Sequence, residues 1–105
     1  MRLQQMRDLI AAEPLGLGRG MMYDPDTGLR CALGVLADVQ QRREGIYLNM
    51  ETLEVLRVVF PHPLYAWMGL LWLNDSGGPP DETPLERQAR IVSAFDAAPH
   101  SMGRA

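Results

Sequence analysis

The sequence predicts a mainly α-helical protein, with about five short helices packed around a central apolar helix and one small β-hairpin around residues 20–30. Apolar residues recur at helical spacing in several segments, and clusters of glycine and proline separate these segments. The most apolar stretch, LYAWMGLLWL at residues 64–73, is apolar on every helical face. Such a helix is expected to be buried, so we place it at the centre, with Trp67, Leu70 and Leu71 in the core.

The N-terminal segment predicts one helix followed by the hairpin. Apolar residues from Leu3 to Ile10 lie on one helical stripe, and Pro14 ends the helix because the residue before a proline avoids the α region. A glycine-rich connector follows at residues 15–20. The sequence DPDTG at residues 24–28 predicts a turn, since its proline presets φ and its glycine accepts a positive φ. Short apolar runs on either side of the turn indicate the hairpin.

The middle of the chain predicts two more helices. The pattern becomes helical at Cys31, and Gly45 is a natural residue to follow the end of that helix. Gly34 within the helix costs roughly 1 kcal/mol relative to alanine, so we expect another backbone segment to approach closely there. Asn49 is a suitable N-cap for the next helix, which covers residues 50–60.

The C-terminal helix has a well-defined start signal. Thr83 and Glu86 form a capping box around a proline at the first helical position, and Pro99 is expected to end the helix. Arg87 and Arg90 are expected on its exposed, mixed-charge face. The buried stripe is expected to consist of Leu85, Ala89, Val92 and Phe95.

Length and composition indicate a single domain over residues 1–105, with a frayed tail at residues 100–105. The formal net charge of −3 argues against a general attraction to nucleic acid or to an anionic membrane. One cysteine cannot form an internal disulfide, and no apolar stretch approaches the ~20 residues that cross a bilayer. We therefore expect a cytoplasmic protein that does not bind a membrane.

Cys31 is the first candidate for chemistry, because a thiol at a helix N-terminus has a lowered pKa. A nucleophilic cysteine also needs a base within about 3 Å, and the only histidines are His62 and His100. His62 and Asn74 lie at opposite ends of the predicted central helix, about 15 Å apart for ~10 residues, so they are poorly placed to share a site. We expect Cys31 to be a small buried residue, with catalysis by Cys31, or by Asn74 and Asp75, as the alternative.

No complete metal or nucleotide motif is present in the sequence. The glycines of the connector lack the preceding strand and following helix of a dinucleotide site, and the histidines and cysteine lack metal-ligand spacing. We expect neither a metal nor a cofactor.

The candidate binding residues come from two places in the sequence. Met21, Met22 and Tyr23 lie in the predicted hairpin and are candidates for a docking edge, because methionine-rich surfaces adapt to partners. Arg87 and Arg90 are candidates for a local basic patch.

Two short motifs resemble those of uncharacterised small proteins of bacteriophages and bacteria. They are Cys-x-Leu-Gly-Val-Leu at residues 31–36 and Leu-Asn-Asp-x-x-Gly at residues 73–78. The resemblance covers residues 1–96 and departs from that group in the proline-rich loop before the last helix. It implies no activity, but it implies that Asn74 and Asp75 approach the first turn of the helix after Cys31, whose N–H groups need acceptors. We expect Asp75 to make this contact.

Small size, acidity and an incomplete catalytic set favour a non-enzymatic protein-interaction module. By analogy, we expect a phage or mobile-element accessory protein that binds and modulates a host protein, for example by inhibiting a defence nuclease. The alternative is a small enzyme that uses Cys31, or Asn74 with Asp75. A nucleic-acid-binding regulator is the third hypothesis, and the negative charge argues against it. The sequence leaves the oligomeric state open.

Overall fold

The computed structural model describes residues 2–37 and 49–98, and in this part of the chain it consists of helices joined by irregular loops. The mainly α-helical class is therefore confirmed. The helices of this part are α1 (Leu3–Ala11), α2 (Ala32–Leu36), α3 (Met50–Val59), α4 (Met68–Ser76) and α5 (Pro84–Ala97). No helix among the described residues is both long and apolar enough to cross a membrane.

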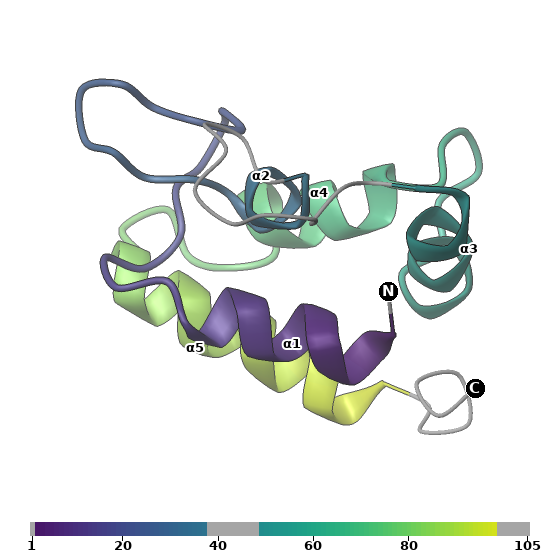
Figure 1. The fold of residues 1–105 in the computed structure, drawn as a ribbon. Helices are drawn as coiled ribbons and strands as arrows, with labels where there is room; N and C mark the ends of the chain where they lie inside the picture. Colours follow the sequence, from purple (N-terminus) through teal and green to yellow (C-terminus); the bar gives the residue numbers. More distant parts are fainter. Residues whose placement is uncertain (1, 38–48, 99–105) are drawn as a thin grey trace.

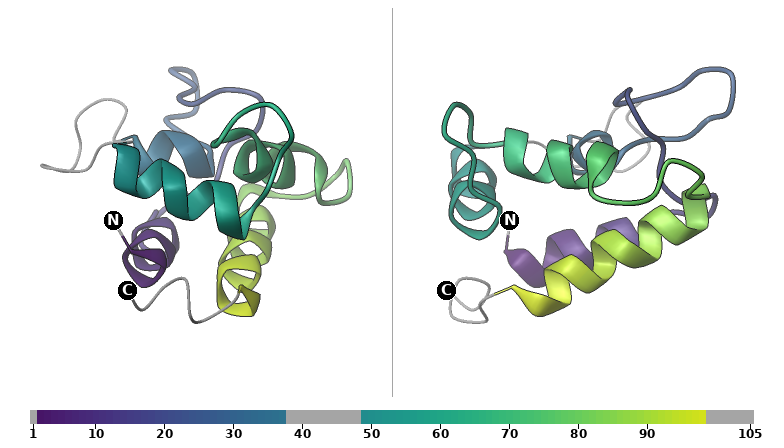
Figure 2. Two further views of the ribbon diagram at one scale, coloured as in Figure 1. Left: turned by 90° about the vertical axis from the view of Figure 1, so that its right-hand side faces the viewer. Right: turned by 180° about the vertical axis from the view of Figure 1, so that it is seen from behind.

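The helices form two layers and one crossing helix. In Figure 1, α1 and α5 lie side by side and antiparallel, and α2 and α4 lie above them. The helix α3 runs across one end of the molecule, as the left view of Figure 2 shows. Side chains from all these helices meet in one core, and its largest fully buried apolar members include Met6, Ile10, Leu36, Leu56, Leu70 and Ile91.

The helix buried on all sides is α2. Every residue from Ala32 to Leu36 is buried. A Cβ at Gly34 would overlap the carbonyl oxygen of Met22, which belongs to the loop that precedes the helix. The predicted close approach of another backbone is thus confirmed, because only glycine leaves room for it. The predicted continuation of this helix toward Gly45 lies outside the described residues.

The expectation that the apolar stretch forms a fully buried central helix is wrong. The helix α4 begins only at Met68, after the first residues of that stretch. Leu70 is fully buried as predicted, and Trp67 and Leu71 pack against the core while partly exposed. Trp72 faces solvent, because α2, α3 and α5 contact α4 without surrounding it.

The predicted hairpin is also wrong. Between α1 and α2 the described residues make only two isolated bridges, which pair Arg30 with Leu17 in parallel and with Tyr23 antiparallel. The turn itself is present, since Gly28 has a φ of +76° and donates its N–H to the carbonyl oxygen of Asp24 at 2.8 Å. At the start of the predicted hairpin, the N–H of Gly20 donates to Oδ1 of Asp75 in α4 at 3.1 Å instead of to a neighbouring strand. Just before it, the N–H of Leu17 donates to the carbonyl oxygen of Pro84 in α5 at 3.0 Å.

Both predicted N-caps are confirmed. Asn49 caps α3, with Oδ1 accepting a hydrogen bond from the N–H of Thr52 at 2.9 Å. The capping box of α5 is complete: the N–H of Glu86 donates to Oγ1 of Thr83 at 3.2 Å, and the N–H of Thr83 donates to Oε1 of Glu86 at 2.9 Å. These bonds satisfy N–H groups that have no partner within their own helices.

The buried face of α5 differs from the predicted stripe. The helix buries Arg87, Gln88, Ile91 and Phe95. Leu85 and Ala89, which belong to the predicted stripe, are exposed. Gln88 shows why a polar side chain lies inside, since its Nε2 donates to the carbonyl oxygens of Ile10 and Glu13, each at 2.8 Å. Helix ends leave such carbonyls without intrahelical partners, so Gln88 completes the end of α1 and joins it to α5.

Replacing Gly34 with alanine tests the contact between α2 and the loop. In an open helix, alanine is more stable than glycine by about 1 kcal/mol. At Gly34 we expect the opposite sign, a loss of about 1–3 kcal/mol, because the new methyl group must displace the backbone of Met22. Chemical denaturation measures the change. The exposed Ala89→Gly variant is the control and should lose about 1 kcal/mol from helix propensity alone. A stabilised Gly34→Ala protein would contradict the contact.

Candidate functional site

Asn74 is fully buried where α2, α4 and the loop after α1 meet. Its Oδ1 accepts a hydrogen bond from the N–H of Ala32, the first residue of α2, at 3.0 Å. Its Nδ2 donates to the carbonyl oxygen of Gly18 at 2.9 Å and to Oδ1 of Asp75 at 2.8 Å. The predicted bridge between the two motifs is confirmed, and it occupies both ends of the amide.

The prediction that Asp75 contacts the start of α2 is wrong, because its neighbour Asn74 makes that bond. Asp75 follows Asn74 by one residue and is therefore turned about 100° around the helix axis, so it does not share the position of Asn74 beside Ala32. Its Oδ1 accepts a hydrogen bond from the N–H of Gly20 at 3.1 Å. The carboxylate therefore holds the loop rather than the helix.

Cys31 is the N-cap of α2 and is fully buried. Its Sγ accepts a hydrogen bond from the N–H of Gly34 at 3.4 Å. Burial raises the pKa of the thiol, and the nearby Asp75 carboxylate raises the pKa further. A buried thiol with a raised pKa carries little thiolate at neutral pH, so the environment of Cys31 fits a structural residue rather than a nucleophile.

Arg87 and Arg90 are not on an exposed face, contrary to the prediction. Arg87 is buried, and its Nη1 donates to the carbonyl oxygen of Leu17 at 2.9 Å. Arg90 is partly buried and donates to the carbonyl oxygens of Leu73 and Asn74, at 2.6 and 3.0 Å, in the last turn of α4. A cation is favourable at the end of a helix, so Arg90 caps α4. Both side chains are committed to the fold and do not form a basic patch.

Glu82 pairs with both arginines and is nearly buried. Its Oε2 lies 2.6 Å from Nε of Arg90, and its Oε1 lies 3.2 Å from Nε of Arg87. The hydrogen bond from Arg90 holds the pKa of this carboxyl below its usual range. This cluster was not identified from the sequence, where Glu82 belongs to a loop and carries no motif.

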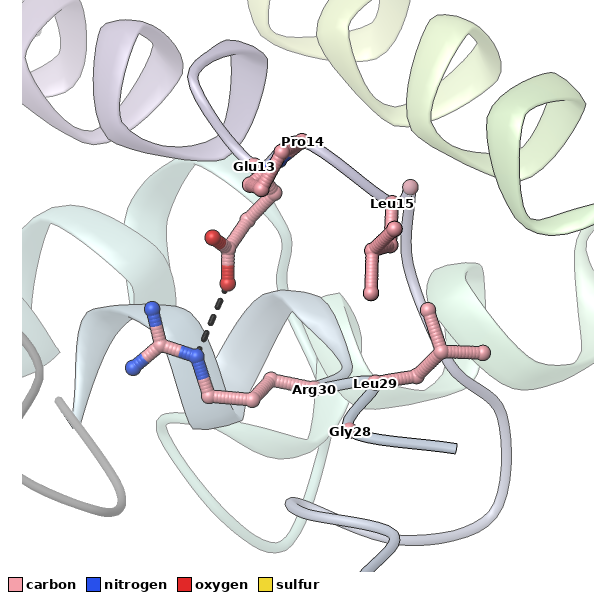
Figure 3. Close-up of a pocket in the computed structure, with 7 residues that line it drawn as sticks. Glu13, Pro14, Leu15, Gly28, Leu29 and Arg30 are labelled. Atoms are coloured by element: carbon pink, nitrogen blue, oxygen red, sulfur yellow. Dashed lines mark hydrogen bonds and ion pairs between the residues drawn. The ribbon is translucent and has the colours of Figure 1, made fainter. Parts of the chain in front are cut away.

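A second buried ion pair joins the end of the α1 segment to the residue before Cys31. In Figure 3, Glu13 and Arg30 reach toward each other, and Nε of Arg30 lies 2.8 Å from Oε1 of Glu13. The cavity beside them has a volume of about 10 Å³, which is the space of one water molecule at most. The site is therefore too small for a substrate, and the pair serves to hold the loop against α1.

The outer side of α4 carries a much larger hollow. A groove of about 360 Å³ is lined by Pro61, His62, Gly69, Trp72, Leu73, Ser76 and Gly77. Trp72 is 64% exposed, and its ring meets the ring of His62 edge to face, with centroids 6.0 Å apart. A Cβ at Gly69 would overlap the carbonyl oxygen of Phe60, so the chain after α3 lies directly against α4 beside the groove.

Large apolar side chains continue beyond the groove. Leu64 is 73% exposed and Tyr65 is 52% exposed, although both belong to the stretch that was predicted to be buried. Leu64 is tied to the groove, because its N–H donates to Nδ1 of His62 at 3.2 Å. We call Pro61, His62, Leu64, Tyr65, Trp72 and Ser76 the Trp72 face. Sequence reasoning missed this face because the stretch is uniformly apolar, and only the proline pair around His62 signals an interruption.

The predicted docking edge at Met21, Met22 and Tyr23 lies in the loop over α2. Both methionines are exposed, and Tyr23 is half-buried. Within the described ranges, no group of three histidine, cysteine or acidic side chains is placed to hold a metal ion. The methionine loop is thus an exposed apolar patch separate from the Trp72 face.

Truncating two neighbouring side chains separates their roles. Asn74→Ala leaves the N–H of Ala32 and the carbonyl oxygen of Gly18 without a side-chain partner. We expect a loss of at least about 2 kcal/mol, because each unsatisfied buried group costs about 1–3 kcal/mol. Asp75→Asn keeps an acceptor for Gly20 and should lose less than about 1 kcal/mol. A denaturation series in which Asp75→Asn is the more damaging change would contradict these roles.

The loss of stability at acidic pH tests the role of Glu82. Its pKa is depressed in the folded protein, so it stabilises the fold above its unfolded pKa of about 4.3, and this contribution is lost as pH falls through the folded pKa. We expect Glu82→Gln to lower stability at pH 7 and to flatten the fall in stability below about pH 4.5. Glu54→Gln is the matched control, because Glu54 pairs with Arg57 on the exposed surface and should change little. If the stability of Glu82→Gln fell below about pH 4.5 as steeply as that of the wild type, the role assigned to Glu82 would be refuted.

No family model, no curated protein and no solved structure matches this chain. The resemblance to uncharacterised phage and bacterial proteins therefore stays a prediction based on the two motifs.

Proposed function

We propose that this chain is a non-enzymatic protein-interaction module that docks through the Trp72 face. The observation that carries the proposal is the exposure of Trp72, 64%, on the wall of a groove of about 360 Å³. Tryptophan has the largest apolar area to bury, and it is enriched among the residues that dominate binding energy at protein interfaces. A monomer gains nothing from leaving this area in water.

The environment of the polar residues supports binding over catalysis. Cys31, Asn74 and Arg87 are each buried and bonded to main-chain groups. The groove itself is lined by one histidine and one serine, and its other lining residues are proline, glycine, tryptophan and leucine. These polar groups hold the fold, and the lining of the groove is mainly apolar.

A serine hydrolase is the enzyme class that the groove suggests as an alternative, because Ser76 and His62 both line it. In such enzymes the histidine donates its Nδ1–H to a carboxylate, which fixes the ring for proton transfer. Here Nδ1 of His62 accepts a hydrogen bond from the N–H of Leu64 at 3.2 Å. The nitrogen that would need to donate is an acceptor, so His62 lacks the orientation of a catalytic base.

The class of partner that we expect from the sequence is part of this proposal. The expected accessory role, in which a phage-encoded or mobile-element protein modulates a host protein such as a defence nuclease, is compatible with a small module that has one apolar docking face. The small size and net charge of −3 support this role by analogy.

Affinity capture with matched variants tests the proposal. Tagged wild-type protein, Trp72→Gln and Met50→Gln are each incubated with bacterial lysate, and the bound proteins are identified and then purified for binding measurements. We expect the binding of a captured protein to weaken at least about tenfold in Trp72→Gln and to stay unchanged in Met50→Gln. Met50 is the control because it is 83% exposed at the start of α3, and Pro61 follows the other end of that helix. Equal capture by all three proteins would contradict the proposed face.

A further inference from the structure

We propose that the occupant of the Trp72 face is a second copy of this chain, so that two copies associate about a two-fold axis. This inference rests on the proposed function, and it names the partner of the same face. Three observations carry it: the absence of formal charge from the groove lining, the position of a projecting side chain beside a hollow, and the apolar area available.

The charge distribution suits contact between identical surfaces. In a two-fold interface each patch meets its own copy, so charged residues near the axis face like charges. The residues that line the groove carry no formal charge when His62 is neutral. Two charged groups on α4 and α5 are bonded within the fold, since Asp75 bonds the loop at Gly20, and Arg90 pairs with Glu82. The net charge of −3 opposes association elsewhere on the surface, so this uncharged face is the favourable place for it.

The shape of the face also suits a two-fold axis. Leu64 projects into solvent, 73% exposed, and its backbone is bonded to His62 on the wall of the groove. A projecting apolar side chain and an apolar hollow thus lie next to each other. When one copy turns by 180°, its Leu64 can enter the groove of the other copy while its own groove receives the partner's Leu64. A self-complementary interface requires this reciprocity.

The available area matches a weak dimer. Aromatic side chains bury about 150–250 Å² each, so the exposed parts of Trp72, Tyr65 and Leu64 amount to roughly 300–400 Å² per copy. With the adjoining Pro61 and Ser76, complete burial in two copies gives about 1,000 Å² in total, which is the lower limit for a specific interface. The area is therefore sufficient for a weak dimer.

Sedimentation equilibrium over a range of concentrations tests the dimer. Between about 5 and 500 µM, we expect the average mass of the wild-type protein to rise from 11.7 kDa toward twice that value. Trp72→Gln should remain at the monomer mass over the same range, and Met50→Gln should follow the wild type. Tryptophan emission gives a second readout, because association removes Trp72 from water and should shift the emission to shorter wavelength only in proteins that dimerise.

Ser76→Arg is the second variant, for the case in which Trp72→Gln weakens the fold. Ser76 is exposed at the end of α4, so an arginine fits without disturbing the core and places like charges on the two facing surfaces. With unchanged circular dichroism and melting temperature, we expect at least about a tenfold weaker dimer.

The outcomes distinguish this inference from the proposed function. A wild-type protein that stays monomeric at every concentration overturns the dimer, and so does a dimer whose dissociation constant in both Trp72→Gln and Ser76→Arg equals that of the wild type. A monomer that still captures another protein in a Trp72-dependent way retains the proposed docking face but excludes the second copy as its occupant. If Trp72→Gln changes neither the mass nor the captured proteins, both proposals fail.

Discussion

A few buried polar side chains hold the main chain between α1 and α2, and the packing of the helices depends on these bonds. Asn74 from α4 and Arg87 from α5 bind this segment at the carbonyl oxygens of Gly18 and Leu17. The segment forms no strand ladder, so buried main-chain groups need partners from side chains. Because each donor is fixed on its own helix, the same bonds determine where α2, α4 and α5 lie relative to one another.

Because these side chains are bonded within the fold, they are not available for the chemistry that their residue types suggest. A functional site holds polar groups in a cleft with their reactive atoms free and their pKa values shifted toward reactivity. Here burial raises the pKa of Cys31, and the Asn74 amide is bonded at both ends. The residues with the most suggestive chemistry therefore serve the fold, and the accessible face is apolar and aromatic.

The parts of the fold that could be predicted have local causes. The capping box at Thr83, the cap at Asn49 and the close approach at Gly34 follow from residues within a few positions or from the conformational cost of one residue. The burial of Arg87 could not be predicted, because its partner Leu17 is 70 residues away in the sequence. In addition, the pattern of hydrophobic residues along a helix assigns an arginine to the exposed face. The hairpin failed for the same reason, since a distant carboxylate, that of Asp75 in α4, accepts the N–H of Gly20 at the start of the predicted hairpin.

Trp72 is exposed because other sides of α4 make the contacts with the rest of the fold. Leu70 and Asn74 face the interior, and the last carbonyls of the helix are bonded to Arg90. The opposite side receives the chain after α3 at Gly69, and no described segment covers Trp72. Apolar area is worth about 25 cal/mol per Å², so an exposed tryptophan leaves a few kcal/mol of burial unused, comparable to a core leucine. No described segment offsets this loss, which is the physical reason for proposing that Trp72 contacts another protein surface.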